Sequence, residues 1–328
     1  MAKIMTDIRK LALDIYNNKV ANFSKQEAED VIRKAVVDAC GGEFNYYNFK
    51  KNQWDVFQIM SEVLTVASGY LSAEAYNSLV EFRDIALGDT VEFDVKDETL
   101  FRVANVATGT NDIRRQRMFS KRVPMTSFKL AIAIYEEWDM FVAGRVDFAY
   151  MVNKVAESFN HHIGQLIYKG VYESYTGLNT ELQETGSYDE DKLKEMIAKV
   201  EGKTGQKAII LGTKTALSKI KVGAEWVSEN LKDRVLAMGH AGNFYGTPLV
   251  EIPQGLKANS FEFAINEDFL IVIPSGEKIV KFAWVGEAMV IENTDGTARN
   301  DQQIEYKFLR PCAMAVVATN NYGIYRLA

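Results

Sequence analysis

The segment from Val146 to Gly177 constrains the fold more than any other part of this sequence, because it predicts one long uninterrupted helix. Apolar residues recur along it every three or four positions, which places them on one helical face. No proline interrupts the run. At about 1.5 Å per residue the helix would be roughly 40–45 Å long, so it predicts a spine for the rest of the chain. Its apolar positions are Phe148, Met151, Val152, Val155, Phe159, Ile163, Leu166, Ile167 and Val171.

Segments with a different periodicity flank this spine. Residues 89–135 alternate between apolar and polar positions, as in Val91, Phe93 and Val95, which is typical of half-exposed strands. Residues 187–275 mix helical and strand patterns, with Ser187 as the predicted start of a helix. Residues 278–328 return to strands. This order predicts a small α/β unit inserted between the spine helix and a terminal sheet.

Helices are predicted over most of the first 88 residues. A capping box at Ser24 opens the second of them, a third places Trp54 and Phe57 on its buried side, and a short fourth spans about 73–86. Their apolar stripes are narrow, so these helices must pack against something else. Two partners remain open: the rest of the same chain, or a neighbouring copy.

Composition limits the class of protein. A chain of 328 residues with 47% apolar and 25% charged residues is ordinary for a globular protein. The sequence shows neither a signal peptide nor an apolar run long enough for a membrane span. The net charge of −6 argues against a dedicated nucleic-acid binder. Cys40 and Cys312 fit no metal or redox spacing, so we expect buried reduced thiols rather than a disulfide.

Residues 89–135 carry the candidate contact residues, on a predicted charged hairpin. Its outgoing arm is acidic and its returning arm is basic, around a turn at about 107–112. One interpretation is a solvated hairpin whose charges pair across the strands. The other is an arm that leaves the body of the subunit and lies on another copy. The charged residues that we single out are Glu92, Asp94, Arg114, Arg115, Arg117, Lys121 and Arg122.

No motif predicts catalytic, cofactor-binding or metal-binding chemistry. Gly212 to Thr215 superficially resembles a phosphate loop, but the required first glycine is Lys207. The glycine-rich stretch from Gly239 to Gly246 lies in the wrong order for a dinucleotide site, and a flexible surface loop is expected there. His161 and His162 are adjacent, so on a helix they cannot both face one metal, and we expect one to pack and the other to be exposed.

The order of segments resembles a tailed-bacteriophage major capsid protein of the Hong Kong 97-like fold. The local sequence is similar to that family at KAIILGTKTALSKIK (207–221), LKDRVLAMGHAGNFYGTPLVEIPQG (231–255), FLIVIPSGEKIVKFAWVGE (269–287) and YKFLRPCAMAVVATNNYGIYRL (306–327). The resemblance implies an α+β fold in five segments. These are an N-terminal helical arm (1–78), an extended β-hairpin loop (79–140), a peripheral domain with the spine helix (141–185), an axial domain (186–275) and a peripheral β-sheet (276–328).

The resemblance also implies a function, that of a major capsid protein without enzymatic activity or cofactor. Such a subunit would assemble with itself, as pentamers and hexamers, into an icosahedral head shell around a double-stranded DNA genome. Its further partners would be portal, scaffolding or cement proteins and, through weak non-specific contact, the packaged DNA, but no membrane. It would be found in the virion after assembly in the host cytoplasm. The alternatives are an encapsulin-type compartment shell and an α/β enzyme with a site near Gly239 to Gly246.

Overall fold

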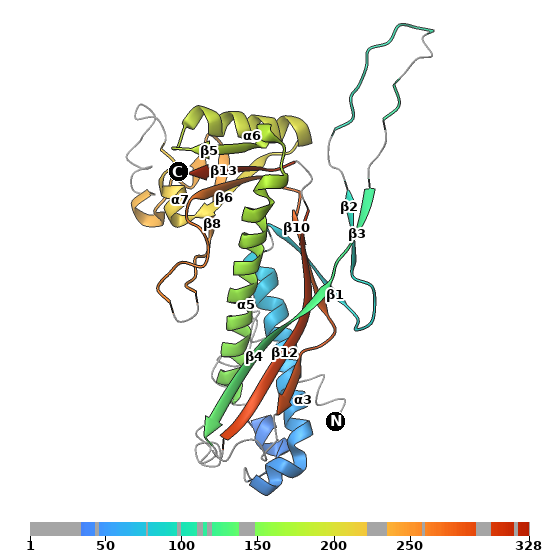
Figure 1. Ribbon diagram of the computed structural model, residues 1–328, viewed down its shortest axis with the longest axis vertical. Helices are drawn as coiled ribbons and strands as arrows, with labels where there is room; N and C mark the ends of the chain where they lie inside the picture. The colour runs from blue at the N-terminus through green and yellow to red at the C-terminus, as the bar shows by residue number, and fades with distance from the viewer. Residues whose placement is uncertain are drawn as a thin grey trace, which may run out of the picture. The chain divides into compact units, whose positions relative to one another are not determined.

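The computed structural model describes residues 34–42, 46–76, 78–96, 100–109, 114–116, 120–137, 148–221, 235–257, 260–292, 303–317 and 321–327. The chain divides into two compact units. Unit 1 comprises Met1–Val91, Met125–Gly164 and Phe282–Met314, and unit 2 comprises Glu92–Pro124, Gln165–Lys281 and Ala315–Ala328. Figure 1 labels most of the helices and strands of both units.

The predicted spine helix is helix α5, which spans Phe148–Glu173. Residues 146 and 147 of the predicted helix lie outside the described residues, and its last predicted turn is a 3-10 helix, η1, over Ser174–Gly177. The apolar stripe is buried as expected, with Ile163, Ile167 and Val171 fully enclosed. The prediction succeeds because a stripe repeated over seven turns is the least ambiguous helical signal in a sequence.

Helix α3 spans Tyr46–Tyr76, so it contains the predicted third helix and the first residues of the predicted fourth. The fourth predicted helix, at 73–86, is wrong: after α3 ends, strand β1 occupies Val80–Ile85. Its Phe82 ring packs 5.4 Å from the ring of Phe282, so tertiary contact overrides the local helical preference. Trp54 also differs from expectation, since 74% of it is exposed although its ring edge contacts Phe57.

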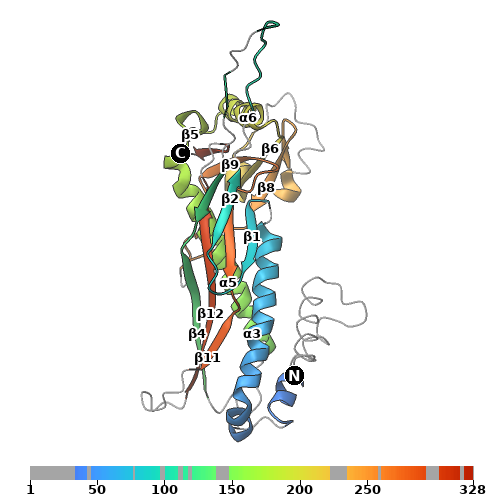
Figure 2. The same ribbon diagram turned by 90° about the vertical axis from the view of Figure 1, so that its right-hand side faces the viewer.

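The sheet of unit 1 is built around one long strand, β12. The strand order is β1-β10-β12-β11, and β4 also pairs with β12. Figure 2 shows β4, β12 and β11 side by side. Phe308 lies opposite both Ile132 of β4 and Val290 of β11, so these three apolar side chains share one face. The bounds are Ser127–Glu137 for β4, Val280–Val285 for β10, Met289–Glu292 for β11 and Gln303–Val316 for β12.

Helix α3 covers this apolar face. The ring of Phe57 meets the ring of Tyr306 edge-on at 6.0 Å, and the Ala288 N–H donates to Thr65 Oγ1 at 3.0 Å. Of the two partners left open for the early helices, α3 therefore packs against its own chain. Both cysteines are buried free thiols, which confirms the prediction, and burial raises the pKa of Cys40 to about 11 and of Cys312 to about 12.

Unit 2 contains a mixed six-stranded sheet in the order β5-β13-β9-β6-β8-β7. β6 lies antiparallel to β9 and parallel to β8, while β13 lies antiparallel to β9 and parallel to β5. All six residues of β9 are buried, as expected for a central strand covered on both faces. The bounds are Gln183–Gly186 (β5), Ala208–Thr213 (β6), Asn243–Phe244 (β7), Thr247–Ile252 (β8), Phe269–Pro274 (β9) and Gly323–Leu327 (β13).

Helix α6, Glu190–Thr204, covers one face of this sheet with Leu193, Met196, Ile197 and Val200. Its N-cap is Asp189, whose side chain accepts from the Asp191 N–H, so the predicted start at Ser187 is two residues early. Glu190 and Asp191 lie in the first turn, where the helix dipole favours acidic side chains. The helix ends at Gly205, which adopts the left-handed conformation typical of a C-cap.

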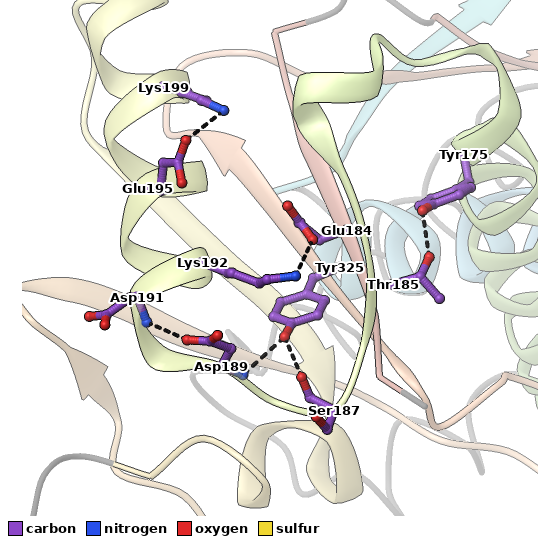
Figure 3. Close-up of polar contacts among 10 residues, drawn as sticks. All are labelled: Tyr175, Glu184, Thr185, Ser187, Asp189, Asp191, Lys192, Glu195, Lys199 and Tyr325. Atoms are coloured by element: carbon purple, nitrogen blue, oxygen red, sulfur yellow. Dashed lines mark hydrogen bonds and ion pairs between the residues drawn. The ribbon is translucent and has the colours of Figure 1, made fainter.

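Strand β13 lies at the end of the chain but completes the sheet of unit 2. Residues 276–328 were expected to form a peripheral β-sheet, and within them Gly323–Leu327 pair with β5 and β9. Figure 3 shows how Tyr325 of this strand binds the turn before α6. Its hydroxyl donates to Ser187 O at 2.6 Å and accepts from the Asp189 N–H at 2.9 Å. The chain terminus thus holds the start of α6 in place.

Replacing Tyr325 with phenylalanine should destabilise unit 2 by about 1–3 kcal/mol, because two half-buried backbone groups lose their partner. Urea denaturation would measure the loss, and amide hydrogen exchange should quicken at Asp189 in particular. Tyr175→Phe is the matched control: within the described part of the chain its hydroxyl bonds Thr185 Oγ1 at an exposed site, so the change should stay within about 0.5 kcal/mol. Equal stability of the Tyr325→Phe variant and the unaltered protein would contradict this account.

Candidate assembly surface

The charged hairpin exists and is held by a short ladder. Strands β2 (Glu92–Lys96) and β3 (Ser120–Pro124) pair antiparallel, with Asp94 opposite Arg122 and Val95 opposite Lys121. The Arg122 guanidinium lies 3.1 Å from Asp94 Oδ1 and 3.5 Å from Glu92 Oε2. The hydrogen bond and charge of Asp94, together with Glu92, raise the pKa of Arg122. The predicted cross-strand charge pairing is therefore confirmed for these three residues.

The base of the hairpin is anchored by apolar side chains and backbone bonds. Val91 and Phe93 are buried, with Phe93 fully enclosed. The Met125 N–H donates to Val91 O at 2.9 Å, one residue beyond the ladder. Pro124 ends β3 opposite Glu92, which fits the edge position expected for a residue without an N–H. These contacts hold the two limbs together at the base of the hairpin.

Beyond the ladder, the described parts of the limbs are exposed. Gln116 links them, since its side chain accepts from the Arg102 N–H at 2.8 Å and donates to Arg102 O at 2.6 Å. Arg114 and Arg115 are exposed on the returning limb. Arg117 lies outside the described residues, and Lys121 is placed in β3 without a described side chain. We call residues 92–124 the arm.

The arm also carries an apolar run that the sequence analysis overlooked. Leu100, Phe101, Val103 and Val106 are exposed by 62%, 59%, 89% and 48%. Among the described residues, the Leu100 N–H donates to Lys203 O at 3.3 Å, which ties this end of the run to the rest of unit 2. In the sequence the run is the segment LFRVANVA, which stands between charged segments whose pattern favours ionic contacts. Four exposed apolar side chains within seven residues are typical of an interaction surface.

The segment from Gly212 to Thr215, which resembles a phosphate loop, has a structural role. Thr213 is the N-cap of the five-residue helix α7, Lys214–Ser218, and its hydroxyl accepts from the Ala216 N–H at 3.2 Å. A Cβ at Gly212 would lie 2.8 Å from the Leu270 side chain, so glycine is needed there for close packing. The motif therefore terminates a strand and opens a helix, and leaves no space for a ligand at this glycine.

Two other motif predictions can be compared with the structure. In the stretch from Gly239 to Gly246, Asn243 and Phe244 form β7 and pair with β8, with Phe244 buried and a tight turn at Tyr245 and Gly246, both at positive φ. Histidines 161 and 162 are both exposed, because the buried stripe of α5 passes through Phe159 and Ile163 instead. Positions 161 and 162 lie between these two buried positions and face away from the buried side of the helix.

A search of the described residues finds no group of three His, Cys, Asp or Glu side chains placed to hold a metal ion. Among the helices within the described ranges, none has a stretch of sufficient length and hydropathy to cross a lipid bilayer.

Comparison with known proteins gives a family. The family model described as "SPbeta prophage-derived putative capsid protein YonB" matches residues 7–326. No curated protein sequence matches significantly. Among solved structures, one titled "Microbacterium phage Oxtober96" is 12% identical with a TM-score of 0.52, over 77% of this chain and 90% of that chain. The structure titled "Asymmetric unit of bacteriophage PhiM1 mature capsid" is 9% identical with a TM-score of 0.53, over 77% and 86%.

These matches confirm the expected α+β, Hong Kong 97-like fold. At such low identity the solved structures establish the fold alone, whereas the family model covers nearly the whole sequence. The parts of this shell-forming subunit are thus a long helix, a sheet packed on α3, a second mixed sheet and an exposed arm. The chain belongs to the YonB family of prophage-derived capsid proteins.

Proposed function

We propose that this chain is the major subunit of an icosahedral phage head and that its arm lies across an adjoining copy in the shell. The observation that carries the proposal is the exposed apolar run from Leu100 to Val106 on an arm whose ladder charges pair internally. Covering this run would stabilise a contact by about 25 cal/mol for each Å² of apolar area removed from water. Within the described residues of a single copy, the run stays exposed.

The charges on the arm would then define where it binds. Asp94 and Glu92 engage Arg122 within the hairpin, so they stiffen the arm and are less available to a neighbour. Arg114 and Arg115 are exposed, so they would be available to acidic groups on a neighbouring copy. Charge complementarity of this kind contributes mainly to orientation and specificity. A shell repeats the contact in every copy, so individually modest contacts add up to a stable particle.

Further parts of the proposal follow from the family. The unit 2 sheet and α6 would gather around the five-fold and six-fold axes as an axial domain, and the unit 1 sheet would form the periphery. The shell would enclose double-stranded DNA after assembly in the host cytoplasm, with portal, scaffolding or cement proteins as further partners. A net charge of −6 suits a container wall, because like charge weakens its binding to packaged DNA.

The test is expression of the full chain, alone and with the neighbouring phage genes, followed by sedimentation and negative-stain electron microscopy. We expect closed particles of uniform size. Particles from complete phage should contain DNA that resists nuclease, whereas a protein cargo in place of DNA would support a compartment shell instead. A chain that remains monomeric under all these conditions and binds a small ligand saturably would refute the proposal.

A further inference from the structure

A second exposed feature lies far from the arm in sequence, in the connection between β8 and β9. Residues 255–257 and 260–264 fold back on one another as a small hairpin, which we call the Phe261 loop. The Ala264 N–H donates to Gly255 O at 2.8 Å, the Lys257 N–H donates to Glu262 O at 2.9 Å, and Leu256 forms a bridge with Phe263. In Figure 1 the loop leaves the sheet at β8.

The Phe261 loop is braced from several sides within unit 2. Lys257 Nζ lies 2.8 Å from Glu262 Oε2, and the Glu262 N–H donates to Ser260 Oγ at 3.0 Å. At the neck, the Gln254 side chain donates to Ile265 O at 2.9 Å, and Ile265 itself is buried. These contacts fix the loop before any partner arrives, so little conformational freedom would be lost on binding.

Three apolar side chains of the loop are exposed to solvent. Phe261 is 96% exposed, the most exposed large apolar residue of the described chain. Leu256 and Phe263, opposite each other and therefore on one face, are exposed by 44% and 50%. Because Phe261 touches almost nothing in its own subunit, it contributes almost nothing to the stability of that subunit.

We propose that Phe261 is an anchor that inserts into an apolar surface on a second copy of this chain. This inference rests on the proposed function, since a shell is where further copies are always adjacent. An aromatic anchor with a polar rim is the usual arrangement of an interaction hot spot, and here the rim is the Lys257–Glu262 pair.

Charge favours a second copy over other occupants. The one base and one acid of the described loop neutralise each other, so the loop offers no positive charge to a nucleic acid or an acidic lipid. Copies with a net charge of −6 repel one another, and they are best joined at locally neutral, apolar points. The Phe261 loop is such a point.

The test compares Phe261→Ser with Phe261→Leu in the full chain. Truncating a hot spot weakens one contact by tenfold or more, and the shell repeats that contact in every copy. We therefore expect Phe261→Ser to lower the particle yield at least tenfold while the urea midpoint of the unassembled subunit stays unchanged. Phe261→Leu should restore most of the yield.

Two controls make the result specific. The charge swap Lys257→Glu with Glu262→Lys keeps the ion pair and the loop, so it should assemble normally. A photo-crosslinking phenylalanine analogue at position 261 should join two copies in particles. Crosslinks to DNA or to a different protein, or a normal yield from Phe261→Ser, would overturn the inference; absence of particles from the unaltered chain would instead refute the proposed function.

Discussion

Changing Arg114, Arg115 and Arg117 together to glutamate is expected to leave a folded, soluble subunit that forms no particles. Arg114 and Arg115 are exposed on the arm, and Arg117 follows them in the same basic segment. Their removal should not disturb the core, because surface substitutions of this kind change stability by about 0.5 kcal/mol or less. Reversal instead places like charges against the acidic groups that we expect on the adjoining copy, and such juxtaposition costs several kcal/mol per contact.

Sedimentation velocity and negative-stain microscopy would measure this effect, and circular dichroism would verify the fold. The matched control is the triple lysine variant, which keeps every charge and should assemble with only reduced efficiency because lysine lacks the bidentate geometry of arginine. Raising the salt concentration should weaken assembly of the unaltered chain as well, since exposed charges are screened beyond about 8–10 Å. Normal shells from the glutamate variant would remove the arm from the assembly contacts.

Arg310→Ala is expected to lower the free energy of unfolding of the unassembled subunit by about 3–5 kcal/mol. Arg310 is only 2% exposed and lies within β12. Its guanidinium stacks 4.6 Å above the ring of Trp284 and donates to Gly286 O at 3.1 Å. Alanine would leave a cavity beside the ring and a carbonyl without its donor. A loss of this size is a large part of the roughly 5–15 kcal/mol typical of a folded protein.

Urea denaturation would report this loss, and Lys129→Ala provides the control. Lys129 lies on β4, paired with β12 at the residue next to Arg310, but its side chain is exposed. Its replacement should change stability by about 0.5 kcal/mol or less. If Arg310→Ala unfolds at the same urea concentration as the control, the buried guanidinium does not stabilise the sheet in the way we describe.

Long or continuous apolar patterns predicted helices and strands well, and short segments did not. Helix α5 and the buried strand β9 follow directly from long or continuous apolar patterns. Strand β1 lies within the predicted helix at 73–86, because six residues are too few to show a period, and its Phe82 packs against Phe282 of the neighbouring strand β10. Asp189 rather than Ser187 caps α6, and the contact of Tyr325 with the backbone of both residues joins positions that no local pattern connects.

The candidate surface divides in the same way. The acidic and basic limbs of the arm were evident from the sequence, and the pairing of Arg122 with Asp94 needed only the antiparallel register. The exposed run from Leu100 to Val106 and the exposure of Phe261 could not be inferred, because an apolar residue in a sequence is ordinarily read as part of a core. Exposure is a property of the folded chain.

The sequence by itself determined the spine helix, the buried strand β9 and the alternation of the strand that opens the arm. Each of these depends on neighbours along the chain, where spacing alone decides which face a side chain occupies. Only the tertiary structure decided that β13 joins the sheet of unit 2, that α3 covers β12, and that Phe261 stays outside the core. Those outcomes depend on residues tens to hundreds of positions apart, whose contacts no local pattern records.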